Sequence, residues 1–279
     1  MTVSPTFSFD DTLSVRRVGF GAMRLTGHGR KPPGEHEQAV AVARRAVELG
    51  VEFIDTADSY GLGANEELLA EALAPYPANV LIATKAGQSR PGGAWVPLGR
   101  PEYLRQQAEL SLRRLRIERI ELFQLHRIDP LVPLEDQIGA LAQLRAEGKV
   151  NRIGLSEVSV EQVEAARGIT DIASVQNRYN LSDRAWEDVL EYCEAAEIAF
   201  VPWLPIASGQ HAGSRGALGK VAAELGATSA QVSLAWLLRR SPVIVPIPGT
   251  GSMEHLEENC AAVSLELSEE QFRTLSSVG

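Results

Sequence analysis

Short apolar runs alternate with amphipathic stretches along most of the chain. Eight runs have the length and apolar content of buried strands: Arg17–Phe20, Glu52–Ile54, Val80–Thr84, Ile120–Leu125, Arg152–Leu155, Ile172–Val175, Ala199–Val201 and Val243–Pro246. Between them, apolar residues recur with the period of a helix over Glu35–Leu49, Glu66–Leu73, Pro101–Leu115, Leu134–Glu147, Ser159–Arg167, Asp183–Ala195 and Ser229–Arg239, and another helix is expected near 217–225. Gly50 and Gly148 follow two of these stretches, as is typical of helix C-termini.

Strands that alternate with helices predict an α/β fold with a parallel sheet. Eight such units in 279 residues match a (β/α)8 TIM barrel, which takes about 250 residues. No linker or change of composition divides the chain, so one barrel domain over residues 1–279 is expected. Two additions are expected: an N-terminal β-hairpin over Thr6–Val18, which turns at Asp10 and Asp11, and an extra C-terminal helix over Ser268–Ser277, capped by Ser268.

An open doubly wound sheet is the alternative architecture. It would bring the Gly-x-Gly-x-x-Gly fingerprint of dinucleotide sites, but the glycine pairs at 19 and 21 and at 61 and 63 both lack the third glycine. The sequence also lacks a Walker loop, an HExxH zinc motif, paired cysteines and the Gly-x-Ser-x-Gly of serine hydrolases. The barrel is therefore favoured, and no metal is expected.

Charge and cysteine content narrow the function classes. The formal net charge is −9, whereas a general nucleic-acid binder would present a basic face. A basic run from Arg105 to Arg119 is interleaved with glutamates at helical spacing, which is typical of a salt-bridged, solvated helix face. The two cysteines, Cys193 and Cys260, lie far apart in the sequence, so a disulfide framework is not expected.

We do not expect this chain to act at a membrane. Its first residues show no charged start followed by an apolar run, so no signal peptide is expected. The longest apolar stretch, Ile198–Ala207, is too short to span a bilayer and contains two prolines. We therefore expect a soluble, cytoplasmic protein.

Polar residues follow the predicted strands, one after another. In a barrel, the residues just past the carboxyl ends of the strands line the active site. In chain order these are Asp55, Lys85, His126, Ser156 with Glu157, Gln176 with Asn177, Trp203, and the segment Pro248–Gly251. A single lysine or histidine in such a place is usually structural, but titratable groups at one level of successive strands predict an active site.

Tyr60 is the candidate acid of this site. It lies five residues past Asp55, where the strand gives way to a loop, and within expected reach of Lys85. A phenol has a pKa of about 10, and a nearby ammonium group lowers that value. A carboxylate beside the lysine would orient it and keep it charged. We therefore expect a tyrosine of lowered pKa, suited to general acid catalysis.

With these motifs in place, the chain resembles the aldo-keto reductases from Gly19 to about Ser264. The resemblance is carried by Gly-Phe-Gly-Ala-Met at 19–23, Phe-Ile-Asp-Thr-Ala-Asp-Ser-Tyr-Gly at 53–61, Ala-Thr-Lys at 83–85, Leu-His-Arg at 125–127, Gly-Leu-Ser at 154–156, Gln-Asn at 176–177, Ile-Pro-Gly-Thr at 247–250 and Leu-Glu-Glu-Asn at 256–259. These segments match the family in order, spacing and strand position.

The resemblance implies hydride transfer from NADPH or NADH to an aldehyde or ketone in a barrel without a Rossmann domain. It implies that Tyr60 protonates the developing alkoxide, that Lys85 paired with Asp55 lowers the pKa of the tyrosine, and that His126 orients and polarises the carbonyl. It also implies a set of cofactor-binding residues: Gly21, Ala22, Met23, Ser156, Gln176, Trp203, Leu204, Gly249, Thr250, Gly251, His255, Glu258 and Asn259. Within this set, Ser156 and Gln176 match residues that hold the carboxamide, and Trp203 matches the aromatic under the nicotinamide ring.

The sequence departs from the family pattern at two places. Many relatives have Ser-Asn after the fifth strand, whereas this chain has Ser156-Glu157, and a carboxylate cannot donate a hydrogen bond to the carboxamide oxygen. Many relatives also hold the 2′-phosphate of NADP with lysine or arginine in the last cofactor segment, where this chain has Gly249, Gly251 and His255. NADPH is favoured as the cofactor, with NADH the alternative.

The substrate is expected to be a small carbonyl compound. Trp95, in the Pro- and Gly-rich loop Ala86–Arg100, is the candidate wall of an aromatic substrate pocket; its alternative role is a surface anchor of the loop. The segment Val201–Pro205 and the short chain resemble bacterial family members related to pyridoxal reductases, so pyridoxal or another aromatic aldehyde is the expected substrate.

Two other functions are weighed against the reductase. A non-catalytic NADP-binding regulatory protein of the same fold would keep the cofactor but need not keep the whole set of Asp55, Tyr60, Lys85 and His126. A Schiff-base lyase would use Lys85, but that chemistry needs a lysine of lowered pKa, and Asp55 would keep the amine charged. The sequence does not indicate an oligomeric state.

Overall fold

The computed structural model describes residues 4–27, 33–206 and 216–277. Its central element is a curved sheet of seven parallel strands in the order β11-β10-β9-β8-β5-β4-β3. The strands are β3 (Phe20–Gly21), β4 (Phe53–Asp55), β5 (Leu81–Ala86), β8 (Ile120–Leu125), β9 (Val150–Ser156), β10 (Ser174–Gln176) and β11 (Ala199–Phe200). Neighbours in the sheet follow one another along the chain, as expected when each strand is joined to the next by a helical crossover.

Residues 243–248 close the sheet into a barrel. Phe200 of β11 forms a parallel bridge with Ile244, and the Val245 N–H donates to the Phe200 carbonyl at 2.8 Å. On the other side, the Gly19 N–H donates to the Pro246 carbonyl at 2.9 Å. Prolines 246 and 248 have no N–H to donate, so this segment occupies the eighth position without a full ladder. The expected (β/α)8 barrel is confirmed.

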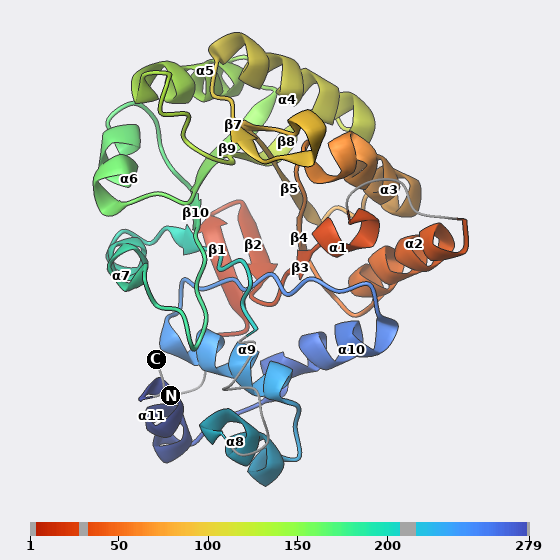
Figure 1. The fold of residues 1–279 in the computed structure, drawn as a ribbon, viewed down its shortest axis with the longest axis vertical. Helices are drawn as coiled ribbons and strands as arrows, with labels where there is room; N and C mark the ends of the chain where they lie inside the picture. Colours follow the sequence, from red (N-terminus) through yellow and green to blue (C-terminus); the bar gives the residue numbers. More distant parts are fainter. Residues whose placement is uncertain (1–3, 28–32, 207–215, 278–279) are drawn as a thin grey trace.

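Helices surround the sheet, as Figure 1 shows. They are α1 (Met23–Thr26), α2 (Pro33–Glu48), α3 (Ala64–Leu73), α4 (Pro101–Leu115), α5 (Leu134–Ala146), α6 (Val160–Arg167), α7 (Glu187–Ala195), α8 (Ala217–Leu225), α9 (Ser229–Arg240), α10 (Met253–Ala261) and α11 (Glu269–Ser276). The strands are therefore covered by the helices on the outer face and by the barrel interior on the other, and all six residues of β5 are buried.

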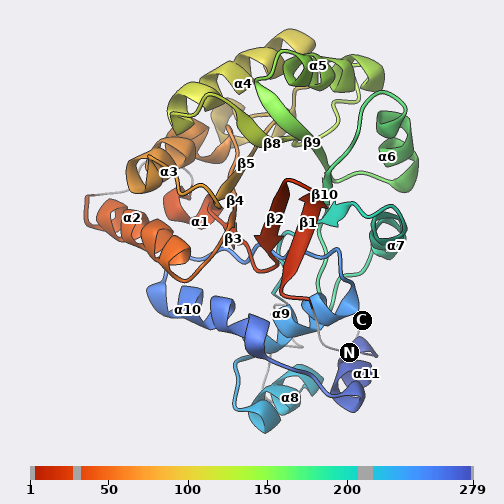
Figure 2. The same cartoon turned by 180° about the vertical axis from the view of Figure 1, so that it is seen from behind.

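The two predicted additions are present. The hairpin consists of β1 (Thr6–Asp10) and β2 (Leu13–Arg16) and lies across the amino ends of the barrel strands, where Phe7 and Val15 are buried (Figure 2). The C-terminal helix α11 begins after Ser268, whose side chain accepts the N–H of Gln271 while that of Gln271 accepts the N–H of Ser268. These contacts form the expected capping box.

The long loop after β5 has structure that the sequence pattern does not predict. It contains a small antiparallel hairpin of β6 (Gln88–Ser89) and β7 (Val96–Pro97). The helix expected over Asp183–Ala195 begins only at Glu187, because residues 180–183 form a tight turn closed by backbone bonds between Asn180 and Asp183. Most of the Gly-rich segment Ser208–Gly219 after β11 lies outside the described residues.

Two further findings concern possible partners. No single helix among the described residues is long and apolar enough to cross a membrane; α8 and α9 pass a test of length and composition only when taken together, and they meet at a bend of 97°. Within the same residues, no group of three or more His, Cys, Asp or Glu side chains could hold a metal ion.

Candidate active site

Asp55 and Lys85 form a buried ion pair at the carboxyl ends of β4 and β5. Lys85 Nζ donates to Asp55 Oδ2 at 2.7 Å and to the Thr56 carbonyl at 2.8 Å. Their side chains are 3% and 0% exposed, so no solvent screens the pair. Burial alone would lower the pKa of Lys85, but the charge and hydrogen bond of Asp55 outweigh burial and raise it. The lysine is therefore held as a cation.

Two glutamines hold the other oxygen of Asp55. Gln176 Nε2 donates to Asp55 Oδ1 at 2.8 Å, and Gln124 Nε2 donates to the same atom at 3.3 Å. Gln176 was expected to hold the carboxamide of the cofactor, and its amide nitrogen is instead directed to Asp55 in this structure. Sequence reasoning missed Gln124, although a lone amide within the apolar strand Ile120–Leu125 was a usable signal.

Tyr60 lies beside the lysine, in the short 3-10 helix η1 (Tyr60–Gly63). Lys85 Nζ is 3.4 Å from the Tyr60 hydroxyl and 5.0 Å from the centre of its ring. Burial raises the pKa of Tyr60, whereas the Lys85 charge acts in the opposite direction and does not overcome it. The expectation of a lowered pKa is thus not met in this structure, because a buried phenolate loses its hydration and Asp55 partly cancels the ammonium charge.

His126 completes the set from the end of β8. Its ring is buried, and Nδ1 lies 3.3 Å from the Ser59 hydroxyl. Burial, with the neighbouring charges of Lys85 and Arg127, lowers the pKa of His126 well below its ordinary value. The imidazole is therefore neutral at physiological pH and carries one N–H.

Trp95 forms an aromatic cluster with Tyr60 and His126. The indole is edge-on to both, with ring centres 6.3 Å from Tyr60 and 5.9 Å from His126. The β6–β7 hairpin brings it to the barrel mouth, and the Arg90 guanidinium lies 3.7 Å from the centre of its ring. Trp95 is 39% exposed, so it borders the site with part of its surface open. The structure thus brings the candidate pocket wall next to the candidate acid.

The predicted cofactor residues lie around the same mouth. The backbone segments of Gly21 and Gly249 approach so closely that a side chain at Gly21 would meet the Ile247 carbonyl at 2.8 Å, and one at Gly249 would meet the Gly21 carbonyl at 2.9 Å. These glycines therefore allow Gly21–Met23 and Gly249–Gly251 to form adjoining parts of one surface. Thr250 accepts the N–H of Ser252, which caps α10.

The remaining cofactor candidates differ in exposure. Ala22, Ser156, Gln176, Thr250 and Asn259 are buried, Gly251, Glu258 and Trp203 are half-buried, and Met23, Leu204 and His255 are exposed. Met23 and Leu204 are 40% and 39% exposed, so each presents apolar surface that a ligand could cover. With the open helix N-terminus of α10, which favours phosphate, these residues fit a dinucleotide.

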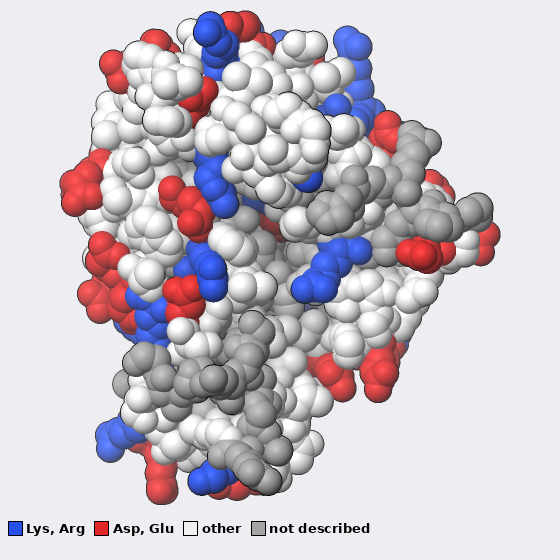
Figure 3. Space-filling view, viewed as in Figure 1, with Lys and Arg blue, Asp and Glu red and all other residues white. Residues whose placement is uncertain are grey.

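Figure 3 shows the face onto which the carboxyl ends of the strands open. This face is hollowed near its centre, and both basic and acidic side chains border the hollow. The border therefore carries charges of both signs, in a chain whose net charge is −9.

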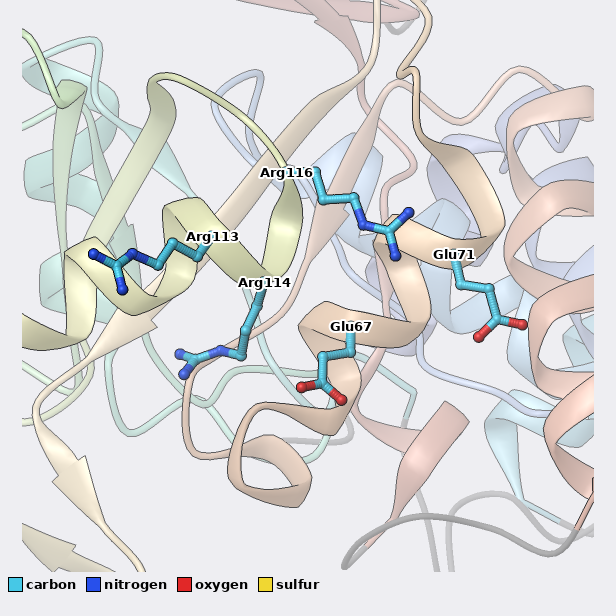
Figure 4. A pocket seen from close by; sticks show the side chains of 5 residues that line it. All are labelled: Glu67, Glu71, Arg113, Arg114 and Arg116. Carbon is cyan, nitrogen blue, oxygen red and sulfur yellow. The ribbon is translucent and has the colours of Figure 1, made fainter.

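A second hollow lies on the outside of the barrel, between α3 and α4 (Figure 4). It is lined by Glu67, Glu71, Arg113, Arg114 and Arg116. Arg114 is bonded to the buried Glu66 at 2.6 Å, and Glu66 in turn accepts the hydroxyl of Thr84 at 2.6 Å. The mixture of acidic and basic side chains is that of a structural salt-bridge network, as the sequence pattern indicates.

Comparison with known proteins agrees with the motifs. The aldo/keto reductase family matches residues 17–279. An uncharacterised oxidoreductase of Schizosaccharomyces pombe is 48% identical over 267 residues, which cover 95% of this chain and 87% of that protein. Pyridoxine 4-dehydrogenase of Escherichia coli is 42% identical over 275 residues, which cover 96% of each.

Solved structures give the same family. The structure of an aldo-keto reductase from Klebsiella pneumoniae in complex with NADPH has a TM-score of 0.86 and 28% identity, and it covers 99% of this chain and 95% of that one. A thermostable aldo-keto reductase in complex with the inhibitor epalrestat also has a TM-score of 0.86, with 29% identity and 98% of each chain covered. The resemblance and the expectation of a nicotinamide cofactor are confirmed at the level of the family: this chain is a member of the aldo/keto reductases.

Proposed function

We propose that this protein reduces an aldehyde or ketone to an alcohol with NADPH, and that Tyr60 is the general acid. The observation that carries the proposal is the buried contact of Tyr60 with the Asp55–Lys85 pair, at a mouth bordered by Trp95 and His126. When bound, the nicotinamide supplies the hydride. The other steps fall to the chain's own side chains.

Tyr60 suits the role of proton donor because burial keeps it protonated. Its raised pKa means that the hydroxyl still carries its proton at neutral pH. As negative charge grows on the carbonyl oxygen, the Lys85 ammonium, 3.4 Å from the hydroxyl, stabilises the charge left on Tyr60 after the transfer. Asp55 holds the lysine in place and keeps it charged, so Asp55 acts through Lys85.

His126 has a role in orientation. Because it is neutral, its single N–H can donate a hydrogen bond to the carbonyl oxygen without competing for the proton of Tyr60. When the Ser59 hydroxyl donates to Nδ1, the ring N–H lies on the other nitrogen, Nε2. The histidine therefore fixes where the oxygen lies relative to the acid.

NADPH is proposed as the cofactor, with NADH as the alternative. The Klebsiella pneumoniae relative was solved in complex with NADPH, and Ser156, Trp203, Thr250 and the start of α10 are the groups that we propose hold the dinucleotide here. No arginine or lysine occurs between Gly249 and Asn259, so a 2′-phosphate would be held by hydroxyl groups, backbone N–H groups and His255 from this segment.

The proposed substrate is pyridoxal or another planar aromatic aldehyde. The edge-on cluster of Tyr60, Trp95 and His126 leaves a partly exposed indole beside the acid, and a flat ring can pack against such a surface. The Escherichia coli relative is named for pyridoxine, the alcohol that corresponds to pyridoxal. This finding supports the same class of substrate.

The two alternative functions are less well supported. A non-catalytic NADP-binding regulator has no need of the complete buried set of Asp55, Tyr60, Lys85 and His126. A Schiff-base lyase needs an uncharged lysine, whereas Asp55 raises the pKa of Lys85. Borohydride trapping of an aldehyde on Lys85 would favour the lyase.

The deciding assay mixes the protein with NADPH or NADH and a panel of aldehydes that includes pyridoxal. Loss of the reduced nicotinamide absorbance is expected, fastest with planar aromatic aldehydes. Cofactor binding without turnover of any aldehyde would contradict the reductase and favour the regulator.

Tyr60→Phe tests the acid directly. Loss of the hydroxyl is expected to lower kcat by about 10²- to 10⁴-fold, the usual contribution of a positioned acid, with cofactor affinity unchanged. Steady-state kinetics and calorimetric titration of NADPH measure the two effects. The matched control is Tyr192→Phe, because the Tyr192 hydroxyl accepts a hydrogen bond from the exposed Arg167 on the outer helices, away from the site. Near-normal kcat in Tyr60→Phe would refute the assignment.

A further inference from the structure

Glu157 is the residue at which the chain departs from the Ser-Asn pair of many relatives. It directly follows Ser156, the last residue of β9. Its φ is 57°, in the left-handed region that residues other than glycine seldom adopt, and its N–H donates to the Gln176 carbonyl at 3.1 Å. A left-handed backbone at a residue other than glycine costs free energy, and such residues cluster at functional sites. The contacts of the Glu157 side chain are therefore of interest.

The carboxylate of Glu157 joins the ends of the two next strands. Its Oε1 atom accepts the indole N–H of Trp203 at 2.6 Å and the backbone N–H of Arg178 at 2.7 Å. Trp203 is bridged to Arg178 in parallel and donates its own backbone N–H to the Asn177 carbonyl at 3.2 Å. Hydrogen bonds to an ionised acceptor are short and strong, so the link from Glu157 to the indole is a firm one.

This link determines how the Trp203 ring lies. The indole is half-buried: it packs against the hydrophobic core, while part of it remains open beside the exposed Leu204. Packing alone restricts an indole to a few rotamers, whereas a bond to its one N–H also decides which edge points towards β9. With both constraints in place, a single orientation of the open face is selected.

We propose that Glu157 is a positioning residue that fixes the Trp203 indole as the platform for the nicotinamide ring. This inference rests on the proposed function and on the family resemblance, which implies that Trp203 lies under the nicotinamide ring. In a Ser-Asn pair, the second residue can donate to the carboxamide; a carboxylate cannot, and Glu157 acts through Trp203 instead. The left-handed backbone at Glu157 aims its side chain at the indole.

The experiment combines the near-ultraviolet circular dichroism of the unliganded protein with calorimetric titration of NADP⁺. Glu157→Gln keeps an acceptor oxygen, so its spectrum and Kd are expected to stay within about twofold of the wild type. Glu157→Ala loses the acceptor, and its spectrum is expected to change in the same bands as that of Trp203→Phe, with NADP⁺ binding weakened about tenfold, the scale of one hydrogen bond to a charged group. The double variant Glu157→Ala/Trp203→Phe should bind NADP⁺ no more weakly than Trp203→Phe alone, because both changes remove the same interaction.

Matched variants separate this role from a structural one. Glu161→Ala removes an exposed carboxylate from the start of the next helix and is expected to leave both readouts unchanged. Glu157→Gly removes the carboxylate while relieving the left-handed backbone, so it should reproduce the alanine variant without loss of folding. An unchanged spectrum and Kd in Glu157→Gly, or additive losses in the double variant, would overturn the role of Glu157. Absence of NADP⁺ and NAD⁺ binding by the wild type would instead overturn the proposed function, and with it the platform role.

Discussion

At the scale of single residues, burial has more influence than charge on the proposed acid. The Lys85 ammonium lies 3.4 Å from the Tyr60 hydroxyl, yet the pKa of Tyr60 is raised, because the phenolate would have no water and Asp55 opposes the lysine. The same burial, with two nearby cations, lowers the pKa of His126. One environment thus keeps both groups in the forms that carbonyl reduction needs.

These two pKa shifts predict a broad pH plateau for reduction. Tyr60 must be protonated to donate, so activity is lost only as pH rises through its raised pKa, above the ordinary 10.0. His126 must be neutral, so activity is lost only as pH falls through its lowered pKa, below 6.5. The dependence of kcat/KM on pH measures both limits. An acidic limb at the ordinary histidine pKa that disappears in His126→Asn would contradict the assigned neutral state.

Asp58 is a buried acid that the proposed reaction does not use. Burial, reinforced by the nearby charge of Glu66, raises its pKa from 3.8 to about 8. Among the described residues its Oδ1 has no hydrogen-bond partner, and its Oδ2 accepts a long bond of 3.5 Å from Tyr103. The folded state therefore holds a proton that the unfolded chain releases above pH 3.8, and the contribution of Asp58 to stability falls as pH rises from about 4 to about 8.

Asp58→Asn is expected to remove this pH-dependent cost. The variant should gain stability relative to the wild type as pH rises from about 4 to about 8, by up to about 1 kcal/mol per pH unit, because asparagine has no proton to release on unfolding. Urea unfolding at about pH 5 and above pH 8 measures the gain. Asp171→Asn, which alters an exposed carboxylate paired with Arg145, is the control and should show no such trend. An equal effect at both pH values would contradict the raised pKa.

At the scale of elements, local sequence signals place helix starts well. Capping boxes are present at Ser159 with Gln162, at Thr228 with Gln231 and at Ser268 with Gln271. In each, two backbone N–H groups that the helix leaves without partners are bonded by side chains three residues apart. Because this bonding is local, the sequence is enough to find it, as it was for α11.

Ser268→Ala should destabilise the protein by about 1 kcal/mol, the usual cost of losing an N-cap side chain. The Ser268 hydroxyl accepts the Gln271 N–H at 3.1 Å, and α11 buries Leu275 against the rest of the fold. Fraying of α11 therefore lowers the free energy of unfolding of the whole protein. Chemical denaturation measures the change. Ser277→Ala, at the other end of the same helix, is the control and should stay within about 0.5 kcal/mol. Equal losses in both variants would argue against the cap.

At the scale of the whole molecule, Arg17 links the start of the barrel to the segment that closes it. Its side chain is 1% exposed, and it donates to the carbonyls of Ile244 at 2.9 Å, Leu238 at 2.9 Å and Ser241. These carbonyls belong to the end of α9 and to the closing segment, over 200 residues away in the chain. The guanidinium thus satisfies acceptors that the irregular closing segment leaves without a ladder.

Arg17→Met should therefore destabilise the barrel by about 3 kcal/mol or more, because it leaves several buried carbonyls without donors. The neighbouring Arg16 is exposed, so Arg16→Met is the matched control and should have a small effect. Thermal unfolding of both variants measures the two losses of stability. A loss of less than about 1 kcal/mol in Arg17→Met would show that the barrel closes without this residue.

The sequence by itself determined the order of strands and helices, the two additions, and the strand-end positions of Asp55, Lys85 and His126, because periodicity and caps are local properties. Only the tertiary structure showed that Gln124 and Gln176 hold Asp55, that burial raises the pKa of Tyr60, and that Glu157 bonds the indole of Trp203. The physical reason is the same for all three: hydrogen-bond partners and desolvation depend on side chains from different strands, which the barrel brings together and no local pattern records.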